Sequence, residues 1–210
     1  MKARYTPSFA EEERLAAQGY RLIAGIDEAG RGALAGPVVA AAVILPRRFK
    51  AGWLKDVNDS KLLTPSRRER LLPFIRQAAI ATGVGIVSHE FIDERNIVIA
   101  TRLAMKQAVE QLSPPPDSLL IDFMRLPEIN MHQKGIKNGD GLCLSIACAS
   151  IVAKVTRDHL MIELDGIYPG YGLCRHKGYC TREHVASLRR LGPCPIHRHS
   201  FRPVKDMLPE

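Results

Sequence analysis

Two adjacent carboxylates, Asp27 and Glu28, follow a short apolar run and lead directly into a glycine-rich turn. The stretch reads GIDEAGRGALAG over residues 25–36, so Arg31 follows the acidic pair by three residues. Turn residues commonly follow a strand, and the glycines alone are ordinary. Two neighbouring carboxylates are less ordinary, because they repel each other unless a cation compensates them. The pattern indicates a site that holds a cation and exposes backbone beside it.

Two further carboxylates stand where they could join this pair. Asp122 ends the apolar segment SLLID, and Asp140 lies in KNGDG just before a long apolar segment, where it could instead be a helix N-cap. If the strands that end near Asp27 and Asp122 are neighbours, their carboxylates converge at one edge of the sheet. Four such acids favour hard Mg²⁺ or Mn²⁺ ions, and paired ions of this kind are typical of phosphodiester hydrolysis. Arg31 and the nearby glycine N–H groups would then face a phosphate or a sugar.

The charge of the chain also points to a polyanionic partner. The 210 residues carry a net charge of +8, and residues 171–206 contain eight Lys or Arg against two acidic residues. A solvated basic face explains such a stretch equally well, but nucleic acid is the partner that it most often binds.

The elements that must position these residues alternate between strands and helices. Apolar runs predict strands over residues 21–25, 37–45, 82–89 and 118–122, with a short edge strand over 129–136. The turn between the first two strands is too short for a helix, so we expect them to be antiparallel. Capping residues and helical spacing predict a short N-terminal helix and helices that begin at Thr64-Pro65, cover 97–112 and 144–164, and follow Thr181.

Together these elements predict an α/β fold, a mixed β-sheet flanked by helices. We expect a single domain over residues 1–210, with a core at about 18–165 and a small, basic, helical C-terminal appendage at 166–210. No apolar run approaches the ~20 residues of a membrane span, and the N-terminus lacks an apolar signal core. The odd number of cysteines, five, favours a reduced, cytoplasmic compartment over a disulfide framework.

The chain resembles ribonuclease HII, the type 2 ribonuclease H, over almost its whole length and with its motifs in the expected order. The resemblance rests on the segments AGIDEAGRGALAGPVVAAAVIL (24–45), NDSKLL (58–63), EFIDERNIVIATRLAM (90–105), LLID (119–122), GDGLCLSIACASIVAKVTRDHLM (139–161), YPGYGLCRHKGY (168–179) and HRHSFRPV (197–204).

This resemblance implies a ribonuclease H-like fold and metal-dependent cleavage of RNA within RNA–DNA duplexes. It also implies nicking on the 5′ side of a single ribonucleotide embedded in DNA, which leaves a 3′-hydroxyl and a 5′-phosphate. We therefore expect a monomeric enzyme whose partners are RNA–DNA hybrids and ribonucleotide-containing DNA. By position, the ligands of one or two Mg²⁺ or Mn²⁺ ions are Asp27, Glu28, Asp122 and Asp140.

The same resemblance assigns roles in substrate binding. The loop Gly30-Arg31-Gly32 corresponds to the backbone grip on the ribonucleotide 2′-hydroxyl, the group that distinguishes RNA from DNA. Tyr179 corresponds to the tyrosine that stacks near the RNA–DNA junction. The residues that correspond to phosphate contacts are Ser60, Lys61, Lys154 and Arg157.

The sequence departs from the family pattern at two positions near the acids. Asn138 stands where the family usually has the lysine of Lys-Gly-Asp, and Phe123 stands where a glycine usually follows the third acid. The first departure affects a phosphate or supporting contact, and the second affects the floor of the site.

Three other interpretations compete with this one. The glycines at 30, 32 and 36 resemble a degenerate dinucleotide fingerprint, but a strand rather than a helix follows them. A structural zinc site could use Cys174, His176, Cys180 and His184, although this is not a usual ligand spacing. The third is a nucleic-acid-binding module without catalysis, which explains the basic segment but not four carboxylates directed at phosphate.

Overall fold

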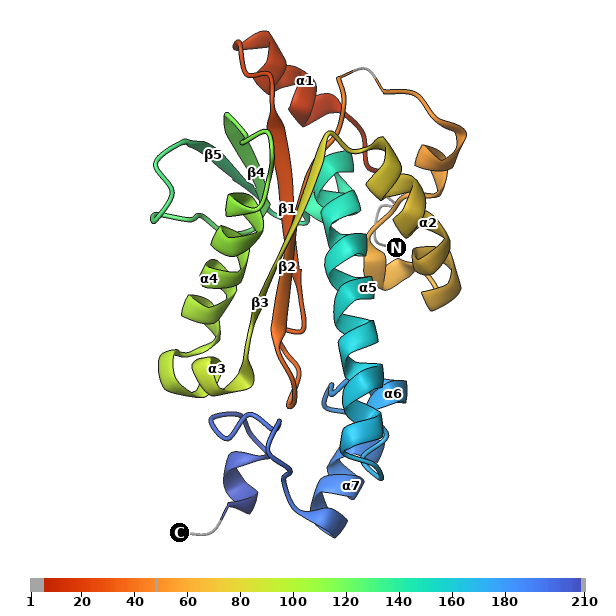
Figure 1. Ribbon diagram of the computed structural model, residues 1–210, viewed down its shortest axis with the longest axis vertical. Helices are drawn as coiled ribbons and strands as arrows, with labels where there is room; N and C mark the ends of the chain where they lie inside the picture. The colour runs from red at the N-terminus through yellow and green to blue at the C-terminus, as the bar shows by residue number, and fades with distance from the viewer. Residues whose placement is uncertain (1–5, 48, 209–210) are drawn as a thin grey trace.

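A mixed, five-stranded sheet forms the centre of the computed structural model, which describes residues 6–47 and 49–208 (Figure 1). The strand order is β3-β2-β1-β4-β5. Antiparallel pairing joins β1 to β2 and β2 to β3, whereas β4 and β5 run parallel to β1. The strands are β1 (Ile23–Ala29), β2 (Val38–Ile44), β3 (Ala81–Val87), β4 (Ser118–Asp122) and β5 (His132–Ile136). The predicted fold class is confirmed.

Helices cover both faces of this sheet (Figure 1). One face carries α3 (His89–Arg95) and α4 (Ile97–Glu110), and the other carries α5 (Leu144–Ile167) with α2 (Pro65–Ala78) packed outside it. The shorter helices are α1 (Ala10–Ala17), α6 (Leu173–His176) and α7 (Arg182–Leu191), and the 3₁₀ turns are η1 (Gly52–Asp56), η2 (Ser60–Leu62), η3 (Gly139–Gly141) and η4 (Lys205–Met207). None of the helices in the described part of the chain is long and apolar enough to cross a membrane.

Strand β2 is fully buried because its alternate side chains enter two different cores. Ala40 and Ala42 belong to the core on the α4 side, and Ala41 and Val43 belong to the core on the α5 side. A strand buried on both faces reads as a continuous apolar run, which is why VVAAAVI predicts it so well.

Small residues let the helices approach the sheet closely. A Cβ atom on Gly25 of β1 would lie 2.2 Å from the backbone carbonyl carbon of Ser145 in α5. A Cβ atom on Gly85 of β3 would lie 1.9 Å from the carbonyl oxygen of Ala104 in α4. These contacts fix the distance between the sheet and the helix on each face.

The C-terminal segment packs onto the end of α5 and onto the loop between β1 and β2. Its apolar side chains share one cluster with Leu34, Ala35 and Met161 from the central fold. Isolated bridges join Ala33 to Tyr179 and Ala35 to His197, so the loop lies between α5 and this segment.

The elements differ from the sequence predictions in three places. Strand β1 continues to Ala29, so the acidic pair lies within the strand and not at its end. The chain turns into α3 at His89, a helix that the sequence did not suggest. The edge strand predicted over residues 129–136 is shorter, since β5 covers His132–Ile136.

Substitution Gly25→Ala should lower the free energy of unfolding by about 1–3 kcal/mol, because the new methyl group must displace the backbone of α5. The cleavage that the resemblance implies should fall as well, since Asp27 lies on the same strand and Asp140 lies just before the displaced helix. Urea unfolding and a nuclease assay measure the two effects. Gly52→Ala is the control, because its Cβ would meet no atom within 4 Å; equal stability of both variants would contradict the close approach.

Candidate active site

Parallel pairing of β1 and β4 brings two of the predicted acids together. Ile26 pairs with Ile121, and Asp27 and Asp122 follow these residues immediately. Asp122 accepts a hydrogen bond from the backbone N–H of Gly139 at 2.7 Å, which attaches the turn that carries the fourth acid to the end of β4.

Asp140 occupies that turn, η3, and does not cap the long helix. Cys143 holds the N-cap position of α5, so the alternative role considered for Asp140 does not apply. Its carboxylate is buried and lies 3.7 Å from the ammonium nitrogen of Lys61, measured from Oδ2 to Nζ. Glu28 lies 3.9 Å from the guanidinium of Arg31, measured from Oε1 to Nη1.

The electrostatics of the four acids show an excess of negative charge. Burial raises the pKa of Asp27 well above its usual range, and the charges of Glu28 and Asp122 raise it further. Burial, followed by the charges of Asp59 and Asp122, raises the pKa of Asp140 to about 6. Burial also raises the pKa of Glu28, although the charge of Arg31 opposes this shift. Burial raises the pKa of Asp122 in the same way, although the hydrogen bond from Gly139 opposes it.

The donor chemistry fits a hard divalent cation. As the side chains stand, no three His, Cys, Asp or Glu residues of the described chain are close enough together to hold an ion. The four acids nevertheless supply only oxygen donors, and each has a raised pKa that added positive charge would lower.

Beside the acids, the loop after β1 is held from within by two buried arginines. Arg198 donates to the carbonyl oxygens of Gly30 at 2.8 Å, Arg31 at 3.0 Å and Gly36 at 2.9 Å. Arg157 donates to the carbonyl oxygens of Ala35 and Pro37 at the end of the loop. It also donates to the carbonyl oxygen of Lys177 in the C-terminal segment. The loop is therefore a rigid part of the site.

Gly30 can only be a glycine in this loop. Its φ of +90° is a conformation that L side chains rarely adopt, and a Cβ atom there would lie 1.8 Å from Nε of Arg157. Its N–H donates to the hydroxyl oxygen of Tyr179 at 3.2 Å. The structure thus brings the predicted loop and the predicted tyrosine into direct contact.

The ribonuclease HII family model matches residues 24–204 of the chain. This protein belongs to the ribonuclease HII family. A ribonuclease HII of Dehalococcoides mccartyi is 58% identical over 202 residues, which cover 96% of this chain and 95% of the relative. Membership makes the protein a ribonuclease H, a hydrolase that acts as an endonuclease.

Solved structures agree with this assignment. An Archaeoglobus fulgidus ribonuclease HII in complex with PCNA matches with a TM-score of 0.74 and 27% identity, over 90% of this chain and 98% of that one. The fold is also that of Bst-RNase HIII in complex with Mn²⁺, which matches with a TM-score of 0.63 and 20% identity, over 89% of this chain and 69% of that one.

Two of the phosphate contacts predicted for this ribonuclease HII do not fit their positions in the fold. Arg157 is fully buried, and its guanidinium donates to the three carbonyls named above. Ser60 is also buried, and its hydroxyl lies 2.7 Å from that of Ser150. The side chains of both residues therefore pack behind the surface of the site.

The other two predicted phosphate contacts occupy different surroundings. The side chain of Lys61 is 74% exposed beside Asp140 and can reach a substrate. Lys154 is held by Asp158 at 2.5 Å and lies 5.4 Å from the centre of the Tyr179 ring. Lys154 therefore supports the tyrosine by a cation–π contact.

The sequence analysis missed the roles of two residues that shape the ribonuclease HII site. Arg198 was counted with the basic surface, but it is buried and holds the loop. Asp93 accepts hydrogen bonds from the N–H groups of His199 and Ser200, and so attaches the C-terminal segment to α3. The motif HRHSFRPV was a signal for the importance of this segment, but nothing in it distinguishes a buried arginine from an exposed one.

The histidines considered for zinc use their ring nitrogens on the protein itself. His176 Nε2 lies 2.8 Å from the carbonyl oxygen of Tyr171. His184 contacts the carbonyl oxygen of Tyr179 through Nδ1 and His197 through Nε2, each at 3.0 Å. Burial lowers the pKa of His184 and of His197 to about 4, so the pair is neutral at pH 7 and supports the backbone around Tyr179.

Without divalent ions, Asp140→Asn should be more stable than the native protein at pH 7–8. The advantage should shrink as pH falls through 6 and vanish below about 4, because the folded state raises the pKa of Asp140 and takes up a proton before the unfolded chain does. Thermal unfolding in EDTA across this range measures the difference. Asp93→Asn should instead lose stability, since that carboxylate accepts hydrogen bonds through both oxygens; an advantage for Asp140→Asn that is constant with pH would contradict the assignment.

Proposed function

We propose that this ribonuclease HII cleaves the RNA strand of RNA–DNA duplexes and nicks ribonucleotide-containing DNA on the 5′ side of the ribonucleotide. The products are a 3′-hydroxyl and a 5′-phosphate. The observation that carries the proposal is the cluster of four carboxylates beside a loop that is anchored by its carbonyl groups. A protein that only bound nucleic acid would gain nothing from this cluster, because it repels phosphate.

The metal ligands in this proposal are Asp27, Glu28, Asp122 and Asp140, which would hold one or two Mg²⁺ or Mn²⁺ ions. When bound, such ions activate water and stabilise the charge that develops on the phosphate and on the leaving oxygen. The Mn²⁺ in a ribonuclease HIII structure of the same fold supports the choice of ion.

The loop after β1 recognises the ribonucleotide through groups that the protein leaves free. Within the described residues, the backbone N–H groups of Arg31 and Gly32 donate to no protein acceptor. The Tyr179 hydroxyl accepts from Gly30 and keeps its own hydrogen to donate. A 2′-hydroxyl both donates and accepts, so it can satisfy these groups, whereas deoxyribose cannot.

Exposed cations hold the duplex around this site. Lys61 lies next to the acids, and Arg182 and Arg189 lie on the outer face of α7. Contacts of this kind bind the phosphate backbone without reading its sequence, and binding should weaken as salt rises. We place the enzyme in the cytoplasm as a monomer; its five free cysteines support a reducing compartment.

The direct test is a labelled DNA duplex that carries one ribonucleotide, incubated with Mg²⁺, Mn²⁺ or EDTA. A metal-dependent nick on the 5′ side of the ribonucleotide is the expected result. Cleavage of an all-RNA hybrid strand without that nick would leave the metal ligands in place and remove the assignment of the loop and Tyr179. Tight binding without any cleavage would favour the non-catalytic module.

Substitution Asp122→Asn should reduce cleavage at least about a thousandfold, because it removes a ligand from the metal site while the Gly139 hydrogen bond can persist. Binding of the duplex, measured by fluorescence anisotropy in EDTA, should be retained. Asp56→Asn is the matched control, since that carboxylate is exposed and pairs with Arg70 away from the acids. Loss of duplex binding by a folded Asp122→Asn protein would contradict the role.

Substitution Tyr179→Ala should impair nicking at a single ribonucleotide more than cleavage of a long hybrid, because a long hybrid offers many 2′-hydroxyl groups to the loop. Tyr179→Phe separates the two functions of the side chain: it keeps the ring above Lys154 and loses the contact with Gly30. We expect Tyr179→Phe to lose about tenfold on the single ribonucleotide, as for a lost hydrogen bond. Equal losses on both substrates would exclude junction sensing by this residue.

A further inference from the structure

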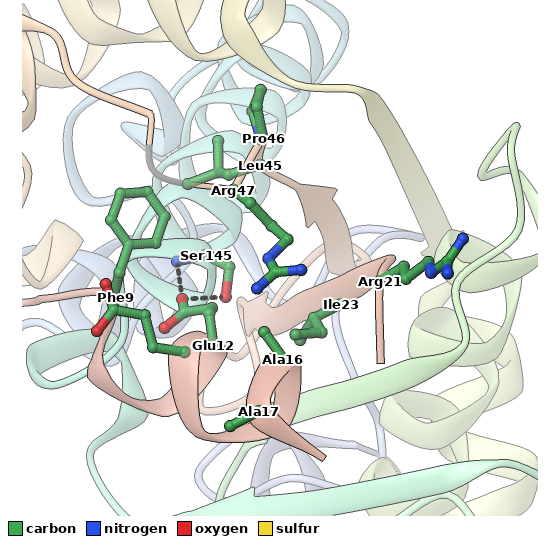
Figure 2. Close-up of a pocket in the computed structure, with 11 residues that line it drawn as sticks. Phe9, Glu12, Ala16, Ala17, Arg21, Ile23, Leu45, Pro46, Arg47 and Ser145 are labelled. Carbon is green, nitrogen blue, oxygen red and sulfur yellow. Dashed lines mark hydrogen bonds between the residues drawn. The ribbon is translucent and has the colours of Figure 1, made fainter. Parts of the chain in front are cut away.

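Helix α5 carries a buried carboxylate, Asp158, that the proposed reaction does not use. The helix itself is fixed at its first turn, where the N–H and the hydroxyl of Ser145 both donate to Oε1 of Glu12 in α1 (Figure 2). Asp158 contacts the neighbouring helix α2, and only 7% of its surface is exposed. A carboxylate is rarely buried to this extent unless cations or hydrogen-bond donors compensate it. Its partners therefore indicate its role.

Two cations from different helices bind this carboxylate, one at each oxygen. Lys154, one turn earlier in α5, donates from Nζ to Oδ1 of Asp158 at 2.5 Å. Arg68 of α2 donates from Nη2 to Oδ2 at 3.2 Å. Both cationic side chains are themselves largely buried, and within the described part of the chain neither forms an ion pair with any other acid. Asp158 therefore compensates both charges.

Through Lys154, the carboxylate reaches the proposed sensor of the 2′-hydroxyl. The ammonium nitrogen of Lys154 lies 5.4 Å from the centre of the Tyr179 ring, and the hydroxyl of that ring accepts from the N–H of Gly30. A lysine side chain has many rotamers, so without a partner it would keep this place only part of the time. The bond to Asp158 removes that freedom and holds the cation against the ring.

Through Arg68, the same carboxylate reaches η2, the turn that carries Lys61. Nη1 of Arg68 donates to the carbonyl oxygens of Ser60 at 2.8 Å and of Leu63 at 2.6 Å. The guanidinium is planar and rigid, so its bonds to Asp158 and to the two carbonyl groups orient the turn relative to α5. Lys61 extends from this turn to within 3.7 Å of Asp140.

We propose that Asp158 is a positioning residue that holds Tyr179 and the η2 turn in a fixed relation across the site. It is buried and acts only through Lys154 and Arg68. One arm serves discrimination of the ribonucleotide, and the other serves binding of the duplex. This inference rests on the proposed roles of Tyr179 at the ribonucleotide and of Lys61 at the duplex backbone.

The first test is Asp158→Asn, which keeps the shape of the side chain and removes its charge. The ratio of kcat/KM on a duplex with one ribonucleotide to kcat/KM on a long hybrid should fall about threefold, as for a weakened cation–π contact. Duplex binding in EDTA, measured by fluorescence anisotropy, should also weaken about threefold, as for coupled neighbours. Glu110→Gln is the matched control, because Glu110 pairs with Lys106 at the same i,i+4 spacing on α4; it should change neither quantity.

Two double-mutant cycles separate positioning from a general loss of stability. The effect of Asp158→Asn on the ratio should disappear in a Tyr179→Ala background, and its effect on binding should disappear in a Lys61→Ala background. Each background lacks the group that Asp158 positions, whereas a purely structural role would lower activity by the same factor in every background. Persistence of either effect, or an unchanged ratio and unchanged binding in the folded Asp158→Asn protein, would overturn the proposal.

Variants of the two arms keep the test decisive if Asp158→Asn does not fold, since that change leaves two buried cations unpaired. Lys154→Met keeps an apolar stem and should lower the ratio without weakening binding. Arg68→Lys keeps a charge for Asp158 but cannot also reach both carbonyl groups, so it should weaken binding without changing the ratio. The reverse pattern, or no change in either variant, would overturn the proposal. A native enzyme that fails to nick at a single ribonucleotide would contradict the proposed function instead, and the Lys61→Ala cycle would still decide whether Asp158 positions η2.

Discussion

Mutual repulsion among four carboxylates is the constraint on which the rest of this structure depends. Burial and neighbouring charge raise the pKa of each acid, so the cluster destabilises the fold that holds it at neutral pH. The fold must supply that free energy elsewhere. It does so with a sheet whose strand β2 is buried on both faces and with helices that approach the sheet at glycine positions. The cations beside the acids, Lys61 and Arg31, compensate only part of the charge, which leaves the remainder for divalent ions.

The loop that faces the substrate depends on a second unusual arrangement, a pair of buried arginines. Burial, together with the neighbouring charge of Arg157, lowers the pKa of Arg198 to about 9. The carbonyl groups of the loop solvate both guanidinium groups, so each backbone carbonyl points inward toward positive charge. The N–H groups of Arg31 and Gly32 are consequently left for an outer partner. The same contacts therefore fix the loop and leave hydrogen-bond donors on its exposed surface, which suit the oxygens of a sugar or a phosphate.

The sequence was sufficient for most of the fold and for the positions of the acids, but not for the environment of the polar residues. Continuous apolar runs located β2 and β4, because strands buried on two faces contain few polar residues. In the sequence, Arg157 and Arg198 have the appearance of surface cations. They are buried because carbonyl groups from distant segments of the chain accept their hydrogen bonds. Ser60 is buried as well, and the partner of its hydroxyl is that of Ser150 in α5. No local pattern reports such long-range partners.

Phe123 shows how a departure from the family motif can be read from backbone conformation. It follows Asp122 with a φ of +61°, a region that favours glycine, and its side chain is 67% exposed. The usual glycine at this position is thus explained by conformation. The phenylalanine retains the turn at a cost of about 1 kcal/mol and presents a ring at the edge of the site, where a base could stack.

Helix α5 connects all of these features, because it contacts each of them along one rigid element. Its first turn donates a hydrogen bond to Glu12 of α1, and Ser150 lies next to Asp27. Further along, Arg157 lies under the ring of Tyr179 and under the loop, and Met161 lies against Gly36. A shift of this helix would move these contacts together. The close approach at Gly25 sets the position of the helix on β1, and it therefore sets the geometry of the acids and of the loop at the same time.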